Sequence, residues 1–115
     1  MIMGKLLSYS APITTDAGGY FNLTNIQSLD GFTKVNFVIV VETPPTPIPL
    51  TATVQMGKIS GSTLSSWIDH FVVPVATPSP YLMIKTYNVI GPELNISLNG
   101  MKNTTYKIQA WAYLQ

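Results

Sequence analysis

The sequence predicts an all-β protein, which we expect to be an antiparallel two-sheet β-sandwich of about eight strands, with a jelly roll favoured over an immunoglobulin-like arrangement. Three observations support this expectation. Short segments of alternating apolar and polar residues recur about every 10–15 residues, turn-forming residues separate them, and helical periodicity is nearly absent. The connections are too short for crossover helices, so neighbouring strands should pair antiparallel. With 115 residues, the chain is expected to form a single domain, residues 1–115.

The N-terminal half contains three predicted strands. Lys5–Ser10 ends before Ala11-Pro12, and Tyr20–Thr24 follows a turn at Gly18-Gly19. Phe32–Glu42 has the strongest pattern, because every second residue is apolar on one face. That apolar face consists of Val35, Phe37, Ile39 and Val41. The other face is polar at both ends and apolar in the middle, so we expect this strand to be central in its sheet and covered on both sides.

A proline-rich segment separates the two halves of the chain. Four prolines lie between Thr43 and Pro49. Proline removes a hydrogen-bond donor from a strand and fixes the backbone in an extended geometry, so we predict a crossover loop over residues 43–50. A docking motif for a proline-binding partner and a contact between subunits are the alternatives.

The C-terminal half contains the remaining strands. We predict them at Thr51–Lys58, within Leu64–Val75, and at Tyr81–Val89, Glu93–Asn99 and Thr104–Leu114. Two of these alternate cleanly, which predicts the inward-facing residues Ala52, Val54, Met56, Leu94, Ile96 and Leu98. In Thr104–Leu114, one face carries Tyr106, Ile108, Ala110, Ala112 and Leu114.

Charge is scarce along the whole chain. Charged residues make up 10% of the sequence, against about 25% in typical proteins, and the net charge is +1. The basic residues are six scattered lysines without any arginine, so we expect no nucleic-acid partner. Mean hydropathy is +0.27, and a low net charge does not resist association. We therefore expect other copies of the chain to cover part of the surface, as in a homo-oligomer; a neutral surface rich in Ser, Thr and Asn is the alternative.

Catalytic and metal-binding constellations are missing from the sequence. The one histidine, His70, is adjacent to Asp69, and neighbouring residues of a strand point to opposite faces. We therefore predict no catalytic residue, no enzyme activity and no cofactor. With one histidine and no cysteine, we also predict no transition-metal site, and a thiolate metal site is excluded. A calcium site formed by distant acids such as Asp16, Asp30 and Glu93 is left open.

Aromatic residues of the C-terminal strands form the candidate ligand site. Trp111 and Tyr113 share one strand face, and Tyr81 and Tyr87 lie on a strand near others rich in Asn. Aromatic rings that stack on sugars, surrounded by amide side chains, are typical of carbohydrate-binding proteins. The alternative is that these rings fill a core or a subunit interface, where Tyr and Trp are enriched.

The end of the sequence carries a resemblance. It contains Gly91-Pro92-Glu93-Leu94 and, further on, Ile108-Gln109-Ala110-Trp111-Ala112-Tyr113-Leu114. This C-terminal quarter resembles small uncharacterised bacterial β-sandwich proteins that end in a GPxL…IQAWxYL pattern. The resemblance implies a β-sandwich module and transfers no catalytic residue.

These observations favour a non-enzymatic structural protein that self-assembles through its β-sandwich, as a component of a shell, an appendage, a spore surface or a virion. The alternative function is a carbohydrate-binding, lectin-like module with a glycan partner. No apolar segment approaches the length of about 20 residues that a spanning helix needs, and no signal peptide is evident. A location on a cell surface or on a particle is compatible with both functions.

Overall fold

The computed structural model describes residues 4–42, 50–58, 66–73 and 81–115, apart from the side chains of residues 66, 67 and 81. These residues form antiparallel sheets and contain no helix, which confirms the all-β prediction. The four-stranded sheet has the order β1 (Lys5–Ser10), β11 (Ile108–Leu114), β5 (Lys34–Val41), β8 (Tyr81–Asn88). The five-stranded sheet has the order β3 (Tyr20–Asn22), β9 (Glu93–Asn99), β6 (Thr51–Gly57), β7 (Ser66–Val72), with β4 (Gln27–Ser28) also paired to β9. A two-stranded sheet joins β2 (Ile13–Thr14) to β10 (Thr105–Tyr106).

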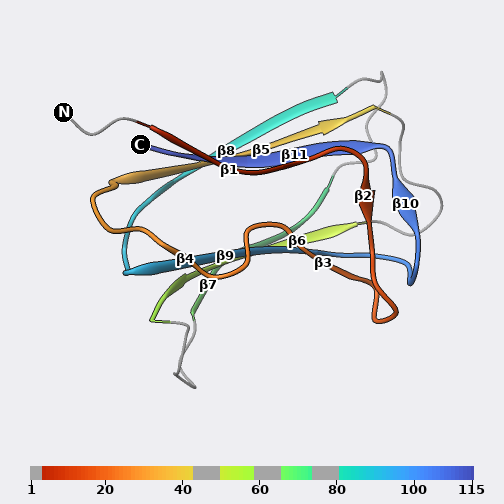
Figure 1. Ribbon diagram of the computed structural model, residues 1–115, viewed down its shortest axis with the longest axis horizontal. Coiled ribbons are helices and arrows are strands. Elements are labelled where there is room, and N and C mark those ends of the chain that lie inside the picture. Colours follow the sequence, from red (N-terminus) through yellow and green to blue (C-terminus); the bar gives the residue numbers. More distant parts are fainter. Residues whose placement is uncertain (1–3, 43–49, 59–65, 74–80) are drawn as a thin grey trace.

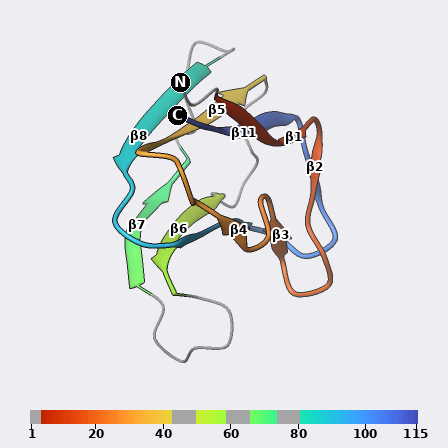
Figure 2. The same ribbon diagram turned by 60° about the vertical axis from the view of Figure 1, so that its left-hand side comes forward.

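The two larger sheets face each other and enclose the core (Figure 1). The small β2–β10 sheet runs between the two layers at one end of the molecule. A view from another side places the edge strands β7 and β8 on the same side of the molecule (Figure 2). Among the described strands, β7 does not pair with β8, and side chains join the layers along this edge.

The core consists of the residues that strand alternation assigns to the inner faces. Every inward-facing residue predicted above for β6 and β9 is buried, which confirms those predictions. The apolar faces of β5, β10 and β11 are buried as well. The largest fully buried side chains are Phe37, Ile13, Leu29, Ile39, Leu50, Met56, Leu94, Ile96, Leu98, Ile108, Leu114 and Val35. Burial of this apolar surface is the main force that holds the two sheets together.

Strand pairing is nested along the chain. We treat β3 and β4 as one interrupted strand and set the small β2–β10 sheet aside. The first strand, β1, then pairs with the last, β11, and the second, β3–β4, pairs with β9. The next two pairs are β5 with β8 and β6 with β7. The chain is therefore arranged like one long hairpin whose two arms are coiled into two layers.

The observed strands differ from the predicted ones at several boundaries. The segment Tyr20–Thr24 forms β3 and then leaves the ladder, because the Thr24 side chain takes over a hydrogen bond to β9. Thr104–Leu114 is interrupted at Lys107, where the chain passes from the small sheet into the four-stranded sheet. The short strand β2 was not predicted.

The proline-rich loop over residues 43–50 lies, except for Leu50, outside the described residues.

The strand β5 is central, as predicted, because it lies between β11 and β8. Its inner face is completely buried. On its outer face, only Val38 is buried, at 8% exposure, since Trp111 and Ile84 flank it in the neighbouring strands. Lys34 and Glu42, at the two ends of this face, are exposed. The outer face of β5 is therefore covered, at its centre, by side chains of the neighbouring strands in the same sheet.

Candidate functional site

The outer face of the four-stranded sheet is apolar along its centre. Strand register places Trp111, Val38 and Ile84 in one row across β11, β5 and β8. The next row contains Val40 beside Leu82. Leu82 and Ile84 are 57% and 58% exposed, although both are large aliphatic residues. We call this surface the apolar face; it consists of Leu6, Tyr9, Val38, Val40, Leu82, Ile84, Trp111 and Tyr113.

A bulge in β1 adds Tyr9 to the apolar face. The register between β1 and β11 shifts between Leu7 and Ser10, and Ser8 has a positive φ of 49°. The additional residue reverses the alternation, so Tyr9 turns outward instead of inward. Its ring lies 5.4 Å from the ring of Trp111, and its hydroxyl donates a 2.9 Å hydrogen bond to Gln109. The bulge thereby extends the aromatic surface onto the edge strand.

Along β5 and the strand beside it, the described charges of this face lie at its two ends. Lys34 begins the strand, and Glu42 directly follows it on the same side. The Glu42 carboxylate accepts a 2.6 Å hydrogen bond from Gln109 Nε2. The apolar centre is therefore bounded by Lys34 at one end of β5 and by Glu42, with the exposed Lys107 beside it, at the other.

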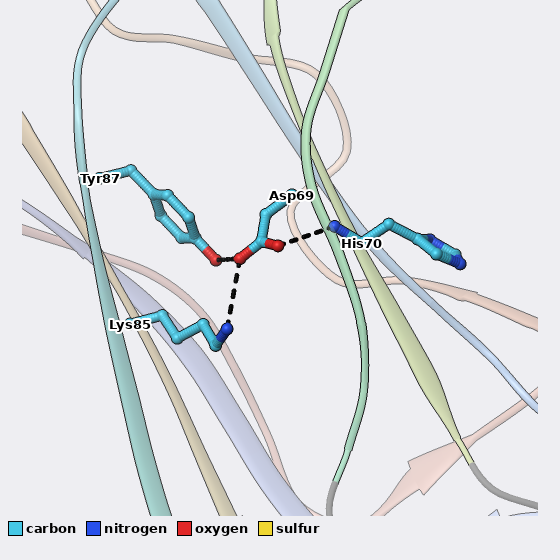
Figure 3. A network of polar contacts seen from close by, with 4 residues as sticks. All are labelled: Asp69, His70, Lys85 and Tyr87. Carbon is cyan, nitrogen blue, oxygen red and sulfur yellow. Dashed lines mark hydrogen bonds and ion pairs between the residues drawn. The ribbon is translucent and has the colours of Figure 1, made fainter.

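A second feature is a polar network between the two edge strands β7 and β8 (Figure 3). Asp69 of β7 pairs with the inward-facing Val54, so its carboxylate points between the layers. It accepts a 2.6 Å hydrogen bond from the Tyr87 hydroxyl and lies 3.5 Å from Lys85 Nζ. The same ammonium group lies 4.2 Å from the centre of the Phe71 ring, in a cation–π contact. We call Asp69, Lys85 and Tyr87 the edge network; it joins the two sheets where no backbone pairing does.

The ionisation of the edge network fits a structural role. Partial burial alone would raise the pKa of Asp69, but the Tyr87 hydrogen bond and the Lys85 charge outweigh burial and lower it. Burial, followed by the hydrogen bond to Asp69, strongly raises the pKa of Tyr87. The phenol therefore keeps its proton and the carboxylate stays charged near neutral pH. Groups held so firmly in one protonation state are poorly suited to general acid–base catalysis at neutral pH.

The predicted separation of His70 and Asp69 is confirmed. The carboxylate accepts a 2.9 Å hydrogen bond from the His70 backbone N–H, while the imidazole lies on the opposite, outer face of the sheet (Figure 3). There His70 Nδ1 shares a 2.8 Å hydrogen bond with the Thr53 hydroxyl. An Asp–His pair of side chains, as in a hydrolytic triad, is not formed here.

A third feature is a shallow polar depression of about 240 Å³ on the outer face of the five-stranded sheet. We call it the polar groove; it is lined by Tyr20, Thr51, Thr53, Gln55, His70, Ser97 and Asn99. Register places these residues in neighbouring rows that cross β3, β9, β6 and β7. Short side chains form its floor, and Tyr20 and His70 lie on the outermost strands.

A tight turn fixes Tyr20 at the end of the groove. The Asp16 carboxylate accepts hydrogen bonds from the backbone N–H groups of Gly18, at 2.8 Å, and Tyr20, at 2.9 Å. The bond from Tyr20, and then that from Gly18, lower the pKa of Asp16. Gly19 has a φ of +86°, and an added Cβ would lie 2.5 Å from the Gly100 carbonyl oxygen, so glycine is required there.

The four aromatic residues predicted to bind a ligand do not share one surface. Trp111 and Tyr113 lie together on the apolar face, as their spacing predicts. Tyr87 points between the sheets and belongs to the edge network. The side chain of Tyr81 lies outside the described part of the structure.

Other residues of these surfaces were not foreseen from the sequence. Tyr9 depends on a bulge, and no residue pattern signals it. Tyr20, Ser97 and Thr51 were assigned to strands, but the strand order that brings them together was not available. The one usable signal for the polar groove in the sequence was the clean alternation of residues 93–99, which places Ser97 and Asn99 on the outward face.

Within the ranges that the structure describes, no group of three or more His, Asp or Glu side chains is placed to hold a metal ion. In the same residues, no helix is long and apolar enough to span a membrane.

Comparisons with protein-family models, with curated proteins and with solved structures found no match for this chain. The resemblance of the C-terminal quarter to small bacterial β-sandwich proteins therefore stays a prediction.

Proposed function

We propose that this chain is a non-enzymatic structural protein that self-assembles through the apolar face, as a subunit of a shell, an appendage, a spore surface or a virion. The observation that carries the proposal is the exposure of this face. Leu6, Tyr9, Leu82 and Ile84 are each more than half exposed. They lie beside Tyr113, Trp111, Val40 and Val38, respectively. Contiguous apolar surface of this kind marks interaction sites on folded proteins.

A second copy of the chain is the occupant that the charges favour. Val38 lies midway between Lys34 and Glu42 on the outer face of β5. The copies can be related by a twofold axis that lies between them and runs across the strands, along the row of Val38. Rotation about this axis reverses the direction of the strands. Lys34 of each copy then faces Glu42 of the other, while the apolar centres meet. The Lys34 and Glu42 charges of the two copies are thus complementary.

The edge strands favour assembly through faces over assembly through strand pairing. Charged side chains that point inward from an edge strand oppose its pairing with another chain. Lys85 has this position on β8, and Asp69 has it on β7. The described centre of the outer face of the four-stranded sheet carries no charged side chain, so the same protection does not apply there.

We further propose that the two facing sheets constitute a jelly-roll sandwich. The nested pairing of first strand with last, second with next to last, and so on inward supports this assignment. A long hairpin coiled into two four-stranded layers produces this order, whereas an immunoglobulin-like sandwich places its strands differently.

Sedimentation velocity over a wide concentration range tests the self-assembly proposal. We expect the wild-type protein to form dimers or larger species, and we expect Ile84→Asp to shift it to monomer, because a buried unpaired carboxylate opposes association. Ile26→Asp is the matched control, since Ile26 is also exposed, at 44%, but lies in the segment between β3 and β4 of the other sheet. A wild-type protein that stays monomeric at about 1 mM would overturn the proposal, since weaker association has little structural use.

A further inference from the structure

The polar groove lies on the opposite side of the molecule from the apolar face, so its use is independent of self-assembly. Its seven lining residues include no carboxylate and no ammonium group. Hydroxyl and amide groups predominate, and both can donate and accept hydrogen bonds. A ligand that fits this surface should be uncharged and should itself carry many donors and acceptors.

The floor of the groove contains polar groups that the described residues leave unpaired. The Ser97 hydroxyl and the Asn99 side-chain amide make no hydrogen bond to the part of the chain that the structure describes, although both residues are half-buried. The neighbouring Thr51 hydroxyl makes only a long bond of 3.3 Å, to the Asn99 carbonyl oxygen. Half-buried polar groups of this kind are satisfied by water or by a ligand.

One aromatic ring accompanies these polar groups. Tyr20 is 56% exposed and is held in place through its own backbone by the Asp16 turn. The ring is therefore presented on a rigid support and does not belong to the core. The strands β3 and β7 lie about 14 Å apart, given three strand spacings of about 4.8 Å each, and His70 lies one row along from Tyr20. This length accommodates a short chain of sugar rings.

We infer that the polar groove binds an uncharged saccharide. A pyranose ring has an apolar face of C–H groups, which stacks on an aromatic ring such as Tyr20, and a rim of hydroxyl groups. Those hydroxyls would bond to Ser97 and Asn99, at the part of the groove nearest to Tyr20. The stack supplies apolar contact at low entropic cost, because tyrosine has few rotatable bonds. The site differs from the pair Trp111 and Tyr113, which the sequence favoured.

Nuclear magnetic resonance titration of the full, isotope-labelled chain tests this inference. The probes are uncharged trisaccharides of glucose, xylose, galactose and N-acetylglucosamine, with a trisaccharide containing glucuronate as the acidic comparison. We expect at least one uncharged sugar to shift the backbone amide signals of Thr51, Thr53 and Ser97, with a Kd of about 1 mM or below. We expect the acidic sugar to bind more weakly than its uncharged equivalent.

Variants distinguish this groove from the rest of the surface. Tyr20→Ala should weaken binding by about tenfold or more, while Tyr20→Phe, which keeps the ring, should stay within about threefold of the wild type. Asn99→Ala provides a second weakening variant in case Tyr20→Ala disturbs β3. Tyr113→Ala, which removes a partly exposed ring from the other sheet, should leave binding unchanged.

Three results would overturn the inference. The first is the absence of shifts at these amides with every uncharged sugar at about 10 mM, a concentration that reveals even weak binding. The second is unchanged binding in both Tyr20→Ala and Asn99→Ala. The third is loss of binding in Tyr113→Ala, which would assign the sugar to the apolar face.

Discussion

At the scale of single residues, two buried threonines replace hydrogen bonds that the strands do not make. Thr24 is completely buried in the gap between β3 and β4. Its hydroxyl accepts a 2.9 Å hydrogen bond from the Ile96 backbone N–H and donates a 2.8 Å bond to the Asn25 carbonyl oxygen. Thr15 has a similar role beside β2, where its hydroxyl accepts a 2.9 Å bond from the Thr104 N–H. Both side chains continue the pairing where a ladder stops.

Replacement of Thr24 tests this role. Thr24→Val keeps the shape of the side chain but leaves the buried Ile96 N–H without its acceptor, so we expect a loss of about 1–3 kcal/mol in the free energy of unfolding. Urea denaturation followed by fluorescence measures this loss. Thr14→Val, at an exposed threonine, is the control and should change stability by less than about 0.5 kcal/mol. Equal effects of the two substitutions would contradict the assigned role.

Single residues also limit what could be predicted from the sequence. Lys5–Ser10 was correctly predicted as a strand, but the bulge at Ser8 was not, because serine carries no signal for a positive φ. A single additional residue reverses the alternation after it. For that reason Tyr9 lies on Trp111, whereas regular alternation from Leu7 would have placed it on the inner face.

At the scale of the elements, the edge strands β7 and β8 hold the layers together with polar side chains. Asp69, Lys85 and Tyr87 occupy inward positions that other strands fill with aliphatic residues. The ion pair itself is partly exposed, so it contributes little stability on its own. The short hydrogen bond from Tyr87 to the charged carboxylate is the stronger of the two links.

The pH dependence of stability tests the edge network. The raised pKa of Tyr87 contributes stability below about pH 10, its ordinary value, and this contribution is lost as the pH rises above it. The lowered pKa of Asp69 contributes stability above about pH 4, and this contribution is lost as the pH falls below it. We therefore expect Tyr87→Phe to be less stable than the wild type by about 1 kcal/mol near neutral pH.

The difference between the two proteins should shrink at both extremes of pH. Denaturant unfolding between about pH 3 and about pH 11 measures this difference. A difference that stays constant over the whole range would show that the Tyr87–Asp69 bond is not linked to either ionisation.

Alternation predicted the elements well because each face of a strand meets one environment. It assigned Leu94, Ile96 and Leu98 to the core, and all three are completely buried. Alternation could not say which face of β8 is inner, since Leu82 and Ile84 are aliphatic and Met83 and Tyr87 are also largely apolar. The aliphatic face proved to be the exposed one. The short strand β2 was missed because two residues show no period.

At the scale of the whole molecule, the two outer faces have opposite character. One sheet exposes the apolar face, with Lys34 and Glu42 at its ends, and the other exposes the uncharged polar groove. Neither surface could be assembled from the sequence, because each draws on strands that are far apart in the chain. Tyr20 and Thr51 belong to one depression only because β9 lies between β3 and β6.

A charge exchange tests the orientation of the proposed dimer. Lys34→Glu alone would place glutamates opposite each other at both ends of the interface, so we expect association to weaken by about tenfold or more at low salt. The double variant Lys34→Glu with Glu42→Lys restores opposite charges and should recover most of the wild-type affinity. Sedimentation equilibrium measures both constants. Failure of the double variant to recover, while Lys34→Glu weakens association, would exclude the twofold arrangement but not association itself.

The nested pairing also sets the order in which the chain can complete its fold. Leu7 pairs with Ala112, so β1 has no partner until β11 has been synthesised and docked. β11 lies between β1 and β5, and one side of β5 therefore remains an open strand edge during most of synthesis. Distant pairing of this kind makes folding slow, on the order of milliseconds to seconds. A nascent chain of this protein is consequently exposed to aggregation through β5 for longer than a protein built from local hairpins would be.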